Sequence, residues 1–224
     1  MDILLHDLWF PDKRLVSDQP GKRSGAHSGG SPNKQAIQPL LGKGYIMRLG
    51  AIFAGGQARR FGSDKAAVEI DGVALIDRVA RQLRPQVDRL VVVGRDWPGL
   101  EKIVDLPAPG LGPLGALAGA LAFAHRNGFT DVLSSGCDLP DLPSDLAQRL
   151  APGPSVIAGQ PLLGLWPAAL AADLRDYLER DGDRAMRSWI ARAGARPIAH
   201  DRPLANINTP EELAAYLAAR GSSA

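Results

Sequence analysis

The sequence predicts an α/β protein in which a mostly parallel sheet lies between two layers of helices. Short, continuous apolar stretches recur along the chain, as they do in strands that are buried on both faces. Stretches with the apolar spacing of helices separate them, and this alternation is typical of connected parallel strands. Ligands of such sheets bind at the carboxyl ends of the strands, so these ends are the first places to inspect for a site.

The composition is that of an ordinary globular protein and argues against several classes. The chain has 224 residues, of which 45% are hydrophobic and 22% are charged, and its net charge is only +2. This small charge does not favour nucleic acid, and no apolar run reaches the roughly 18 residues of a membrane helix. The single cysteine, Cys137, allows no internal disulfide. We therefore expect a cytoplasmic protein that binds neither nucleic acid nor a membrane.

The chain is expected to divide near Met47. Residues 1–46 contain six Gly, four Pro and four Ser without an apolar period, which predicts a disordered or linker-like N-terminal extension. Residues 47–224 are expected to form the domain, and they hold 20 Lys or Arg and 20 Asp or Glu. Because this domain is neutral, any site for an anion in it has to be local.

The first half of the domain alternates strands with one helix. Asp71-Gly72 favours the tight turn of a hairpin, and the apolar residues that follow it have helical spacing. The elements expected up to residue 105 are a strand at 48–54, a hairpin at 68–74, a helix at 75–84, and strands at 89–94 and 102–105.

The second half begins with an Ala- and Leu-rich helix and ends with another helix. Its elements are expected to be a helix at 112–127, a strand at 132–137, a Pro-rich turn at 139–143 with a short helix after it, strands near 156 and 163, helices at 168–180 and 183–193, a strand at 196–199 and a helix at 210–220. Thr209 and Glu212 have the spacing of a capping box, with Pro210 at the first helical position.

A glycine-rich basic loop, "FAGGQARRFGSDK" at 53–65, follows the first strand. It lacks the GxxxxGK[ST] pattern of a P-loop and the spacing of a dinucleotide fingerprint. A glycine pair still lets backbone amides approach a phosphate, and Arg59, Arg60 and Lys65 would add charge-assisted hydrogen bonds. A surface turn with solvated arginines explains the same residue types equally well.

Two acids at later strand ends favour the phosphate interpretation. Asp105 ends the strand at 102–105, and Asp138 directly follows the strand at 132–137. A carboxylate at such an edge is costly unless it meets a cation or backbone donors. Either one alone could cap a helix, but both beside a basic loop favour Mg²⁺ held together with phosphates. Cys137 is expected to be a small buried hydrophobic residue, and the histidines show no metal-ligand spacing.

Four motifs in this order carry a specific resemblance. "FAGGQARRFGSDK" resembles the LAGGxxxRxGxDK signature of the nucleotidyltransferase superfamily. "GPLGALAGAL" (112–121), "CDLPDLP" (137–143) and "NINTPEEL" (206–213) are similar to motifs of the MobA family of molybdenum cofactor guanylyltransferases. The resemblance covers residues 47–220 and implies a three-layer α/β/α, Rossmann-like nucleotidyltransferase fold.

The resemblance also implies an activity. The implied reaction takes GTP and molybdenum-bound molybdopterin, gives the guanine dinucleotide cofactor and pyrophosphate, and uses Mg²⁺. Further partners implied by the resemblance are proteins that deliver molybdopterin and chaperones of the recipient molybdoenzymes. Transfer from CTP, a sugar-phosphate acceptor, and a non-catalytic nucleotide-binding role on the same fold remain alternatives, whereas the missing GK[ST] argues against a GTPase switch.

Site residues follow from the resemblance position by position. Lys65, Asp138 and Arg60 are implied to be catalytic, with Asp138 as the ligand of Mg²⁺. The implied nucleotide contacts are Phe53, Ala54, Gly55, Gly56, Lys65, Gly94, Asp105 and Asp138. Without its cation, Asp138 is expected to be unpaired, so that Asp138→Asn would keep or raise the stability of the protein.

Three features of the resemblance leave questions open. Many relatives have a nucleotide-contacting Asn where this chain has Gly94, and many have His-Pro where this chain has Gln160-Pro161. Asn206 and Asn208 match a family element near the active site, although the capping box beside them offers a purely structural explanation.

Overall fold

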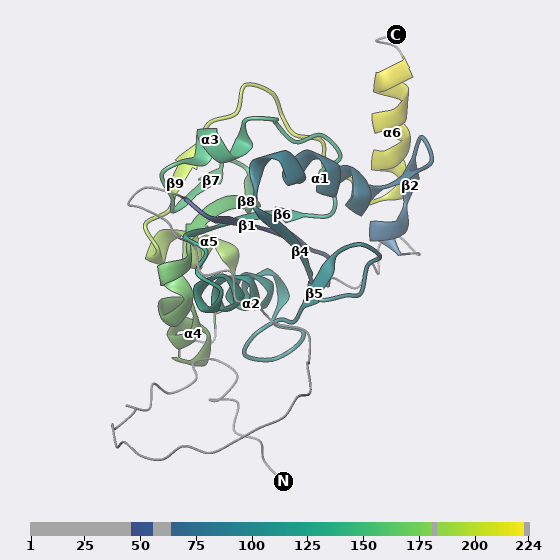
Figure 1. The fold of residues 1–224 in the computed structure, drawn as a ribbon. Coiled ribbons are helices and arrows are strands. Elements are labelled where there is room, and N and C mark those ends of the chain that lie inside the picture. Colours follow the sequence, from purple (N-terminus) through teal and green to yellow (C-terminus); the bar gives the residue numbers. More distant parts are fainter. Residues whose placement is uncertain (1–45, 56–63, 181–182, 222–224) are drawn as a thin grey trace, which may run out of the picture. The chain divides into compact units, whose positions relative to one another are not determined.

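The structure is a computed structural model that describes residues 46–55, 64–180 and 183–221. Within these residues, a seven-stranded sheet has the strand order β5-β4-β1-β6-β8-β7-β9. Figure 1 shows helices α1 and α3 on one side of this sheet, and α2, α4 and α5 on the other. The α/β class and the three layers predicted from the sequence are therefore confirmed.

The middle of the sheet is parallel. β1 (Arg48–Phe53) lies between β4 (Arg89–Val93) and β6 (Asp131–Gly136), and it pairs in parallel with both. β5 (Glu101–Ile103) extends this part of the sheet by pairing in parallel with β4. Since β1 pairs on both edges and is buried on both faces, its sequence is apolar without alternation. The carboxyl ends of these strands meet along one edge.

One strand runs against the others. β8 (Gln160–Pro167) is antiparallel to β6 and to β7 (Ser155–Ile157), while β9 (Arg196–Ile198) is parallel to β7. Only residues 158–159 separate β7 from β8. A connection of two residues can join antiparallel strands but is too short to join parallel ones. The sheet is thus mostly parallel, as predicted.

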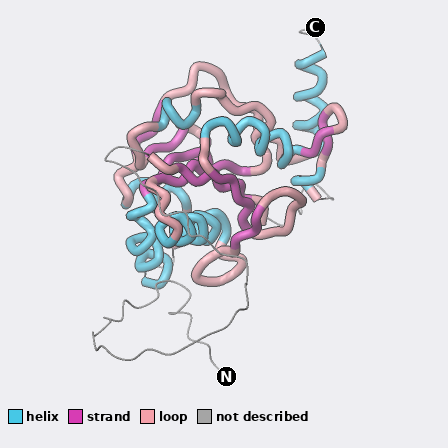
Figure 2. The backbone as a smooth tube through the Cα atoms, viewed as in Figure 1, coloured by secondary structure: helices cyan, strands magenta, loops and turns pink. Residues whose placement is uncertain are grey.

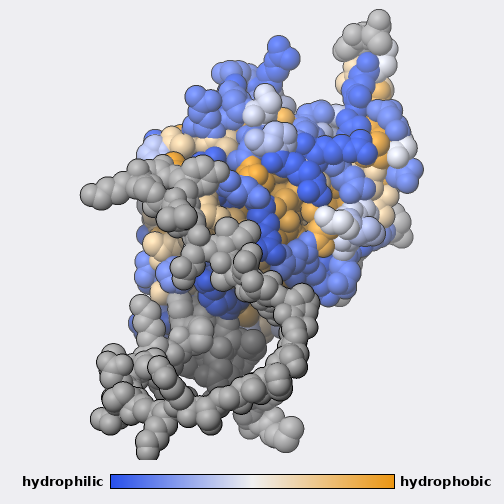
Figure 3. Space-filling view, in the orientation of Figure 1, coloured by the Kyte–Doolittle hydropathy of each residue, from blue (hydrophilic) through white to orange (hydrophobic). Residues whose placement is uncertain are grey.

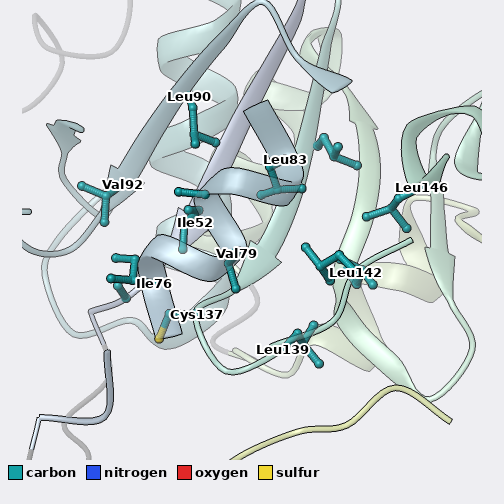
Figure 4. Close-up of a cluster of buried hydrophobic side chains, with 14 of the residues drawn as sticks. Ile52, Ile76, Val79, Leu83, Leu90, Val92, Cys137, Leu139, Leu142 and Leu146 are labelled. Atoms are coloured by element: carbon teal, nitrogen blue, oxygen red, sulfur yellow. The ribbon is translucent and has the colours of Figure 1, made fainter. Parts of the chain in front are cut away.

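Two helices pack on the face that carries the main apolar cluster. They are α1 (Leu75–Leu83), which continues into a 3₁₀ turn at Arg84–Gln86, and α3 (Leu146–Leu150). Figure 4 shows side chains of α1 against those of β1 and β4, with the chain after β6 closing the cluster. Its labelled members are Ile52, Ile76, Val79, Leu83, Leu90, Val92, Cys137, Leu139, Leu142 and Leu146, and each is at most 9% exposed.

The opposite face carries α2, the longest of the described helices that pack on the sheet. α2 (Gly112–Arg126) is the Ala- and Leu-rich helix, and ten of its residues are buried. α4 (Ala171–Arg180), which follows a 3₁₀ turn at Ala168–Leu170, packs beside it. α5 (Met186–Arg192) completes this layer. Gly119 lets α2 approach the chain that directly follows β5, since a Cβ on Gly119 would lie only 2.1 Å from the carbonyl oxygen of Val104.

The last helix, α6 (Pro210–Gly221), packs on the small hairpin rather than on the sheet. The hairpin consists of β2 (Glu69–Ile70) and β3 (Val73–Ala74), and both residues of its turn, Asp71 and Gly72, have positive φ. The turn is therefore of the type that Asp-Gly predicts. Apolar contacts join the hairpin to α6 through Ile70, Leu75, Ile207, Val68, Leu213 and Tyr216. Figure 2 shows α6 and the hairpin side by side.

Several boundaries differ from the sequence prediction by one to three residues. β5 ends at Ile103 rather than at Asp105, β6 begins and ends one residue earlier than predicted, and α5 begins at Met186 rather than at 183. A 3₁₀ helix that was not predicted, η2 (Lys65–Ala67), begins at the last residue of the glycine-rich loop. None of the described helices is both long and apolar enough to cross a membrane. On the face drawn in Figure 3, hydrophilic residues surround hydrophobic ones that gather between α1 and α2. The predicted extension at 1–46 lies outside the described residues, apart from Ile46.

Candidate functional site

Two glycines meet where β1 and β4 end. Gly94 has a φ of +90°, and a Cβ added to it would lie 2.6 Å from the Cα of Gly55. The strands remain paired up to this point, because Ala54 N–H donates to the carbonyl of Val93 at 3.1 Å. Only glycine allows this approach of the two backbones. Position 94, where the family resemblance implies an Asn, therefore has no room for a side chain.

Lys65 joins three distant segments at the same edge of the sheet. Its Nζ donates to Asp138 Oδ2 at 2.9 Å and to Asn208 Oδ1 at 2.5 Å. The side chains of Lys65 and Asp138 are only 16% and 18% exposed. Lys65, Asp138 and Asn208 thus form one cluster, which we call the Lys65 cluster. It joins the predicted phosphate-binding lysine, the predicted metal ligand and the second Asn of "NINTP".

Asp138 is held in this cluster from two further directions. A Cβ on Gly136 would lie 2.4 Å from Asp138 Oδ1, so the strand must end in glycine for the carboxylate to turn back over it. The backbone carbonyl of Asp138 accepts from Ile207 N–H at 3.0 Å. The chain before α6 is therefore bonded directly to the chain after β6.

The expectation that Asp138 is unpaired was wrong. Lys65 lies 73 residues earlier in the chain, and its ammonium neutralises the carboxylate at 2.9 Å. The expected stabilisation by Asp138→Asn loses its basis, because that change would leave the buried end of Lys65 without a counter-charge. The sequence could not show this pairing, since it depends on where the glycine-rich loop returns to the sheet.

Asn208 lies against Lys65 and also borders the capping box before α6. Asn208 accepts from Lys65 and donates through Nδ2 to Asn206 Oδ1 at 2.9 Å. The capping box is present as well, since Glu212 N–H donates to Thr209 Oγ1 at 3.2 Å while Glu212 accepts from Thr209 N–H and from Asn208 N–H. The cap therefore fixes the backbone that presents Asn208 to Lys65.

Asp105 lies beside the contact between Gly55 and Gly94, which we call the glycine crossing. A Cβ on Gly94 would lie 3.6 Å from Asp105 Oδ1, and this oxygen is buried without a hydrogen-bond partner among the described residues. Burial raises the pKa of Asp105, and a backbone hydrogen bond from Gly110 opposes this only in part. The unsatisfied oxygen leaves an acceptor for a donor of the ligand.

The donor set fits a divalent cation only when a ligand completes it. The described residues hold no group of three or more His, Cys, Asp or Glu side chains that could bind a metal by themselves. Mg²⁺ is commonly held by one or two carboxylates together with substrate phosphates and water. Asp138 can supply one such carboxylate. Its neighbour Cys137 is buried and its thiol pKa is raised to about 12, mainly by burial, so it stays a neutral hydrophobic residue as expected.

The other predicted site residues divide into two groups. Phe53 and Ala54 lie at the end of β1 and are each 7% exposed, so only their backbone is suited to contact a ligand. Gly56 and Arg60, with Arg59, lie outside the described residues. Two residues that the sequence analysis missed, Asp64 and Arg95, form an ion pair directly beside Lys65. The acid before Lys65 and the cation after Gly94 were visible in the sequence, but nothing there indicated that they meet.

A model of the MobA-like NTP transferase domain family matches residues 50–197. The chain belongs to this family. The matched range contains Lys65, Asp105 and Asp138 and ends before Asn206. Membership in the MobA-like NTP transferase domain family confirms the predicted resemblance and the prediction that the protein is a nucleotidyltransferase.

Relatives and solved structures agree with this membership. A molybdenum cofactor guanylyltransferase of Rhodobacter capsulatus is 37% identical over 183 residues, covering 75% of this chain and 94% of that protein. One of Sinorhizobium fredii is 33% identical over 190 residues, covering 72% and 87%. The crystal structure of molybdopterin-guanine dinucleotide biosynthesis protein A from Archaeoglobus fulgidus has a TM-score of 0.63 at 22% identity, covering 79% of this chain and all of that one (100%).

A second structural neighbour shows the same likeness in fold. A nucleotidyl transferase from Methanothermobacter thermautotroptrophicus has a TM-score of 0.62 at 20% identity and covers 80% of this chain and 99% of that one. At such low identities the likeness concerns the fold alone. It confirms the predicted nucleotidyltransferase fold, in which the glycine crossing and the Lys65 cluster lie at the carboxyl ends of the central strands.

Proposed function

We propose that this protein transfers GMP from GTP to molybdenum-bound molybdopterin, giving the guanine dinucleotide cofactor and pyrophosphate. The observation that carries the proposal is the Lys65 cluster, in which an ammonium, a carboxylate and an amide meet at the edge where this fold binds ligands. The names of the relatives that cover most of this chain supply the base and the acceptor.

The chemistry consists of one displacement at phosphorus. A terminal phosphate oxygen of molybdopterin forms a bond to the α-phosphorus of GTP, and the bond from that phosphorus to the bridging oxygen of the β-phosphate breaks. The electron pair of the broken bond leaves with pyrophosphate. Because the attacking phosphate is already anionic, the step needs no general base, and the protein's task is to position and neutralise charge.

Each residue of the Lys65 cluster, and Asp105 beside the glycine crossing, has a part in that task. Lys65 binds phosphate oxygens of GTP and stabilises the charge that develops on them. Asp138 would hold Mg²⁺, and the bound cation would neutralise charge on the α-phosphate and the leaving pyrophosphate. Asn208 keeps the Lys65 ammonium directed at this edge through the 2.5 Å hydrogen bond. Asp105 offers its unpaired Oδ1 to a donor of the nucleotide beside the glycine crossing.

The remaining parts of the proposal follow from the activity and from the sequence. Gly55, Gly56 and Gly94 would let the nucleotide approach the backbone, and Arg60 would add charge at the phosphates. We place the protein in the cytoplasm. Proteins that deliver molybdopterin and chaperones of the recipient molybdoenzymes are the further partners we propose.

The test measures product formation with the full chain. The protein is incubated with Mg²⁺, molybdenum-loaded molybdopterin and GTP, CTP, ATP or UTP in turn, and pyrophosphate and dinucleotide products are quantified. We expect product with GTP and loss of about 1.5–3 kcal/mol of transition-state stabilisation in Lys65→Ala, which is roughly a 10- to 150-fold fall in kcat/KM. Product from CTP alone would identify a cytidylyltransferase. Absence of pyrophosphate with every nucleotide would identify a non-catalytic binding protein.

A further inference from the structure

Both oxygens of the Asp64 carboxylate accept hydrogen bonds from the guanidinium of Arg95. Arg95 Nη1 donates to Asp64 Oδ1 at 2.6 Å, and Arg95 Nη2 donates to Asp64 Oδ2. Two parallel hydrogen bonds fix both the position and the plane of the carboxylate, which a single ammonium contact cannot do. This hydrogen bonding is also the main cause that lowers the pKa of Asp64, so the carboxylate stays ionised.

The same carboxylate starts the helical turn that contains Lys65. Asp64 is the N-cap of η2, and its Oδ1 accepts from Ala66 N–H at 3.2 Å. Asp64 is also the residue directly before Lys65 in the chain. We therefore expect a rotation of the Asp64 side chain to shift the backbone from which the Lys65 side chain reaches Asp138 and Asn208.

Arg95 is itself anchored to rigid elements. It directly follows Gly94 at the end of β4, and its guanidinium carbon lies 5.3 Å from the centre of the Trp97 ring. Trp97 Nε1 in turn donates to Asp77 Oδ1 of α1 at 2.8 Å. The Arg95 side chain is 26% exposed. A continuous set of contacts thus leads from α1 through Arg95 and Asp64 to the turn that carries Lys65.

We propose that Arg95 is a positioning residue for Lys65, acting through the Asp64 carboxylate; this role rests on the proposed function of Lys65 at the phosphates of GTP. Both terminal nitrogens of Arg95 are bonded to Asp64, and its Nε is buried. In the proposed role the guanidinium holds the turn and does not touch the nucleotide. Its effect on the reaction must then depend on the presence of the Lys65 side chain.

A double-mutant cycle tests this dependence. The wild type, Arg95→Ala, Lys65→Ala and the double variant are compared by kcat/KM for GTP and by the Kd for Mg·GTP. Arg95→Ala is expected to lower kcat/KM by about tenfold in the wild type, and by less than about twofold in the Lys65→Ala background, where additive behaviour would repeat the full loss. A loss of equal size in both backgrounds would overturn the proposal.

Two further variants separate positioning from charge and from stability. Arg95→Lys keeps the charge without the two-pronged contact, so it should lose as much as Arg95→Ala, and full activity would contradict our account. Arg89→Ala is the matched control, because Arg89 lies at the other end of β4, pairs with Glu101 and lies 5.3 Å from the centre of the Phe123 ring. The Arg89→Ala variant should have an unchanged kcat/KM, even if its melting temperature is lower than that of the wild type.

The measurements also distinguish this proposal from the proposed function. A wild type that binds Mg·GTP but releases no pyrophosphate would contradict the proposed function, and the cycle would then be evaluated on Kd alone. In that case Arg95→Ala should weaken binding only when Lys65 is present. Equal weakening in both backgrounds, or no weakening in either, would reject the role of Arg95.

Discussion

Asp138 has two roles in the structure, and its replacement should show both. Asp138→Asn removes the charge that would hold Mg²⁺, so turnover is expected to fall by at least about a hundredfold, equivalent to about 2.7 kcal/mol. It also leaves Lys65 with a neutral acceptor in a largely buried place, so the free energy of unfolding should fall by about 1–2 kcal/mol. Pyrophosphate release against Mg²⁺ concentration and thermal melts measure the two effects.

Asp131→Asn provides the matched control for that experiment. Asp131 begins the same strand, β6, and pairs with Arg48 at the end of the strand remote from the site, with its side chain 19% exposed. Its replacement should leave turnover and the Mg²⁺ midpoint unchanged. If Asp138→Asn also kept the normal midpoint, the cation would have to be bound elsewhere, and Asp105 would be the first candidate.

Asp105 should lower the stability of the protein at neutral pH while it contributes to activity. Burial raises its pKa above the ordinary value of 3.8, so the folded protein holds this proton more tightly than the unfolded chain does. The wild type therefore loses stability as pH rises through the folded pKa, whereas Asp105→Asn does not. We expect the variant to melt at a higher temperature at neutral pH, with the difference shrinking toward about pH 4, and to be less active. A variant that melts lower at pH 7 would show that Asp105 has a stabilising partner.

Single residues also show how far the site could be predicted. Lys65, Asp105 and Asp138 were recognisable because unusual charges follow buried strands and match family motifs. Their pairing was not, because Lys65 and Asp138 are 73 residues apart and meet only once the loop after β1 returns to the sheet. The ion pair of Asp64 and Arg95 was missed for the same reason, since the two residues are 31 positions apart.

At the scale of elements, the close approach of β1 and β4 makes a prediction about Gly94. Introducing the Asn that the family resemblance implies at this position should not add a nucleotide contact, because its Cβ would lie 2.6 Å from Gly55 Cα and the φ of this residue is +90°. We expect Gly94→Asn to cost at least about 1–3 kcal/mol of stability and to weaken GTP binding. Urea denaturation and titration with Mg·GTP measure these effects.

Gly99 offers a control for that substitution. It lies in the connection between β4 and β5 with a φ of +74°, but a Cβ there would have nothing within 4 Å. Gly99→Asn should therefore cost less and leave GTP binding unchanged. Equal losses at both positions would mean that the backbone angle alone, and not the crossing of the two strands, makes Gly94 necessary.

The type of an element was predictable where the local sequence pattern is strong. The residues at which an element begins and ends were less predictable. The capping box of Thr209 and Glu212 located the start of α6, and Asp71-Gly72 located the hairpin turn. The end of β5 was misplaced by two residues because Val104 and Asp105 continue the apolar-then-acidic pattern after the pairing with β4 has stopped at Ile103. A strand ends where its hydrogen bonds end, and the sequence alone does not display them.

At the scale of the whole molecule, the domain predicted from residue 47 onward should fold by itself. Met47 already contributes to it, because its carbonyl accepts from Thr130 N–H and Thr130 Oγ1, each at 2.8 Å. A variant that starts at Met47 is expected to keep the melting temperature and the activity of the full chain. A variant that starts at Leu49 loses this carbonyl and Arg48, so it should melt several degrees lower, with about 1 kcal/mol shifting the midpoint by about 2–4 °C.

The layers of the fold could be predicted from the sequence, but the order of the strands in the sheet could not. Alternating apolar strands and helices predicted a mostly parallel sheet with helices on both faces. The reversal of β8 depends on the short connection at 158–159 and on pairing with β6, which lies 24 residues or more away in the chain. Such long-range pairing is decided by the packing of the whole sheet, because no single segment specifies its neighbour.

The contact between Lys65 and Asp138 has a consequence for the thermodynamics of ligand binding. Each residue is the counter-ion of the other. A phosphate that takes Lys65 leaves Asp138 with an uncompensated charge that a divalent cation then neutralises, and the same holds in the opposite order. Mg²⁺ and GTP should therefore raise each other's affinity by one common factor, as reciprocity requires, in a range of about 5- to 150-fold. Calorimetry, corrected for the association of Mg²⁺ with GTP in solution, should find this coupling in the wild type and not in Lys65→Ala. With such coupling the site favours the complete metal–nucleotide complex and discriminates against either component alone.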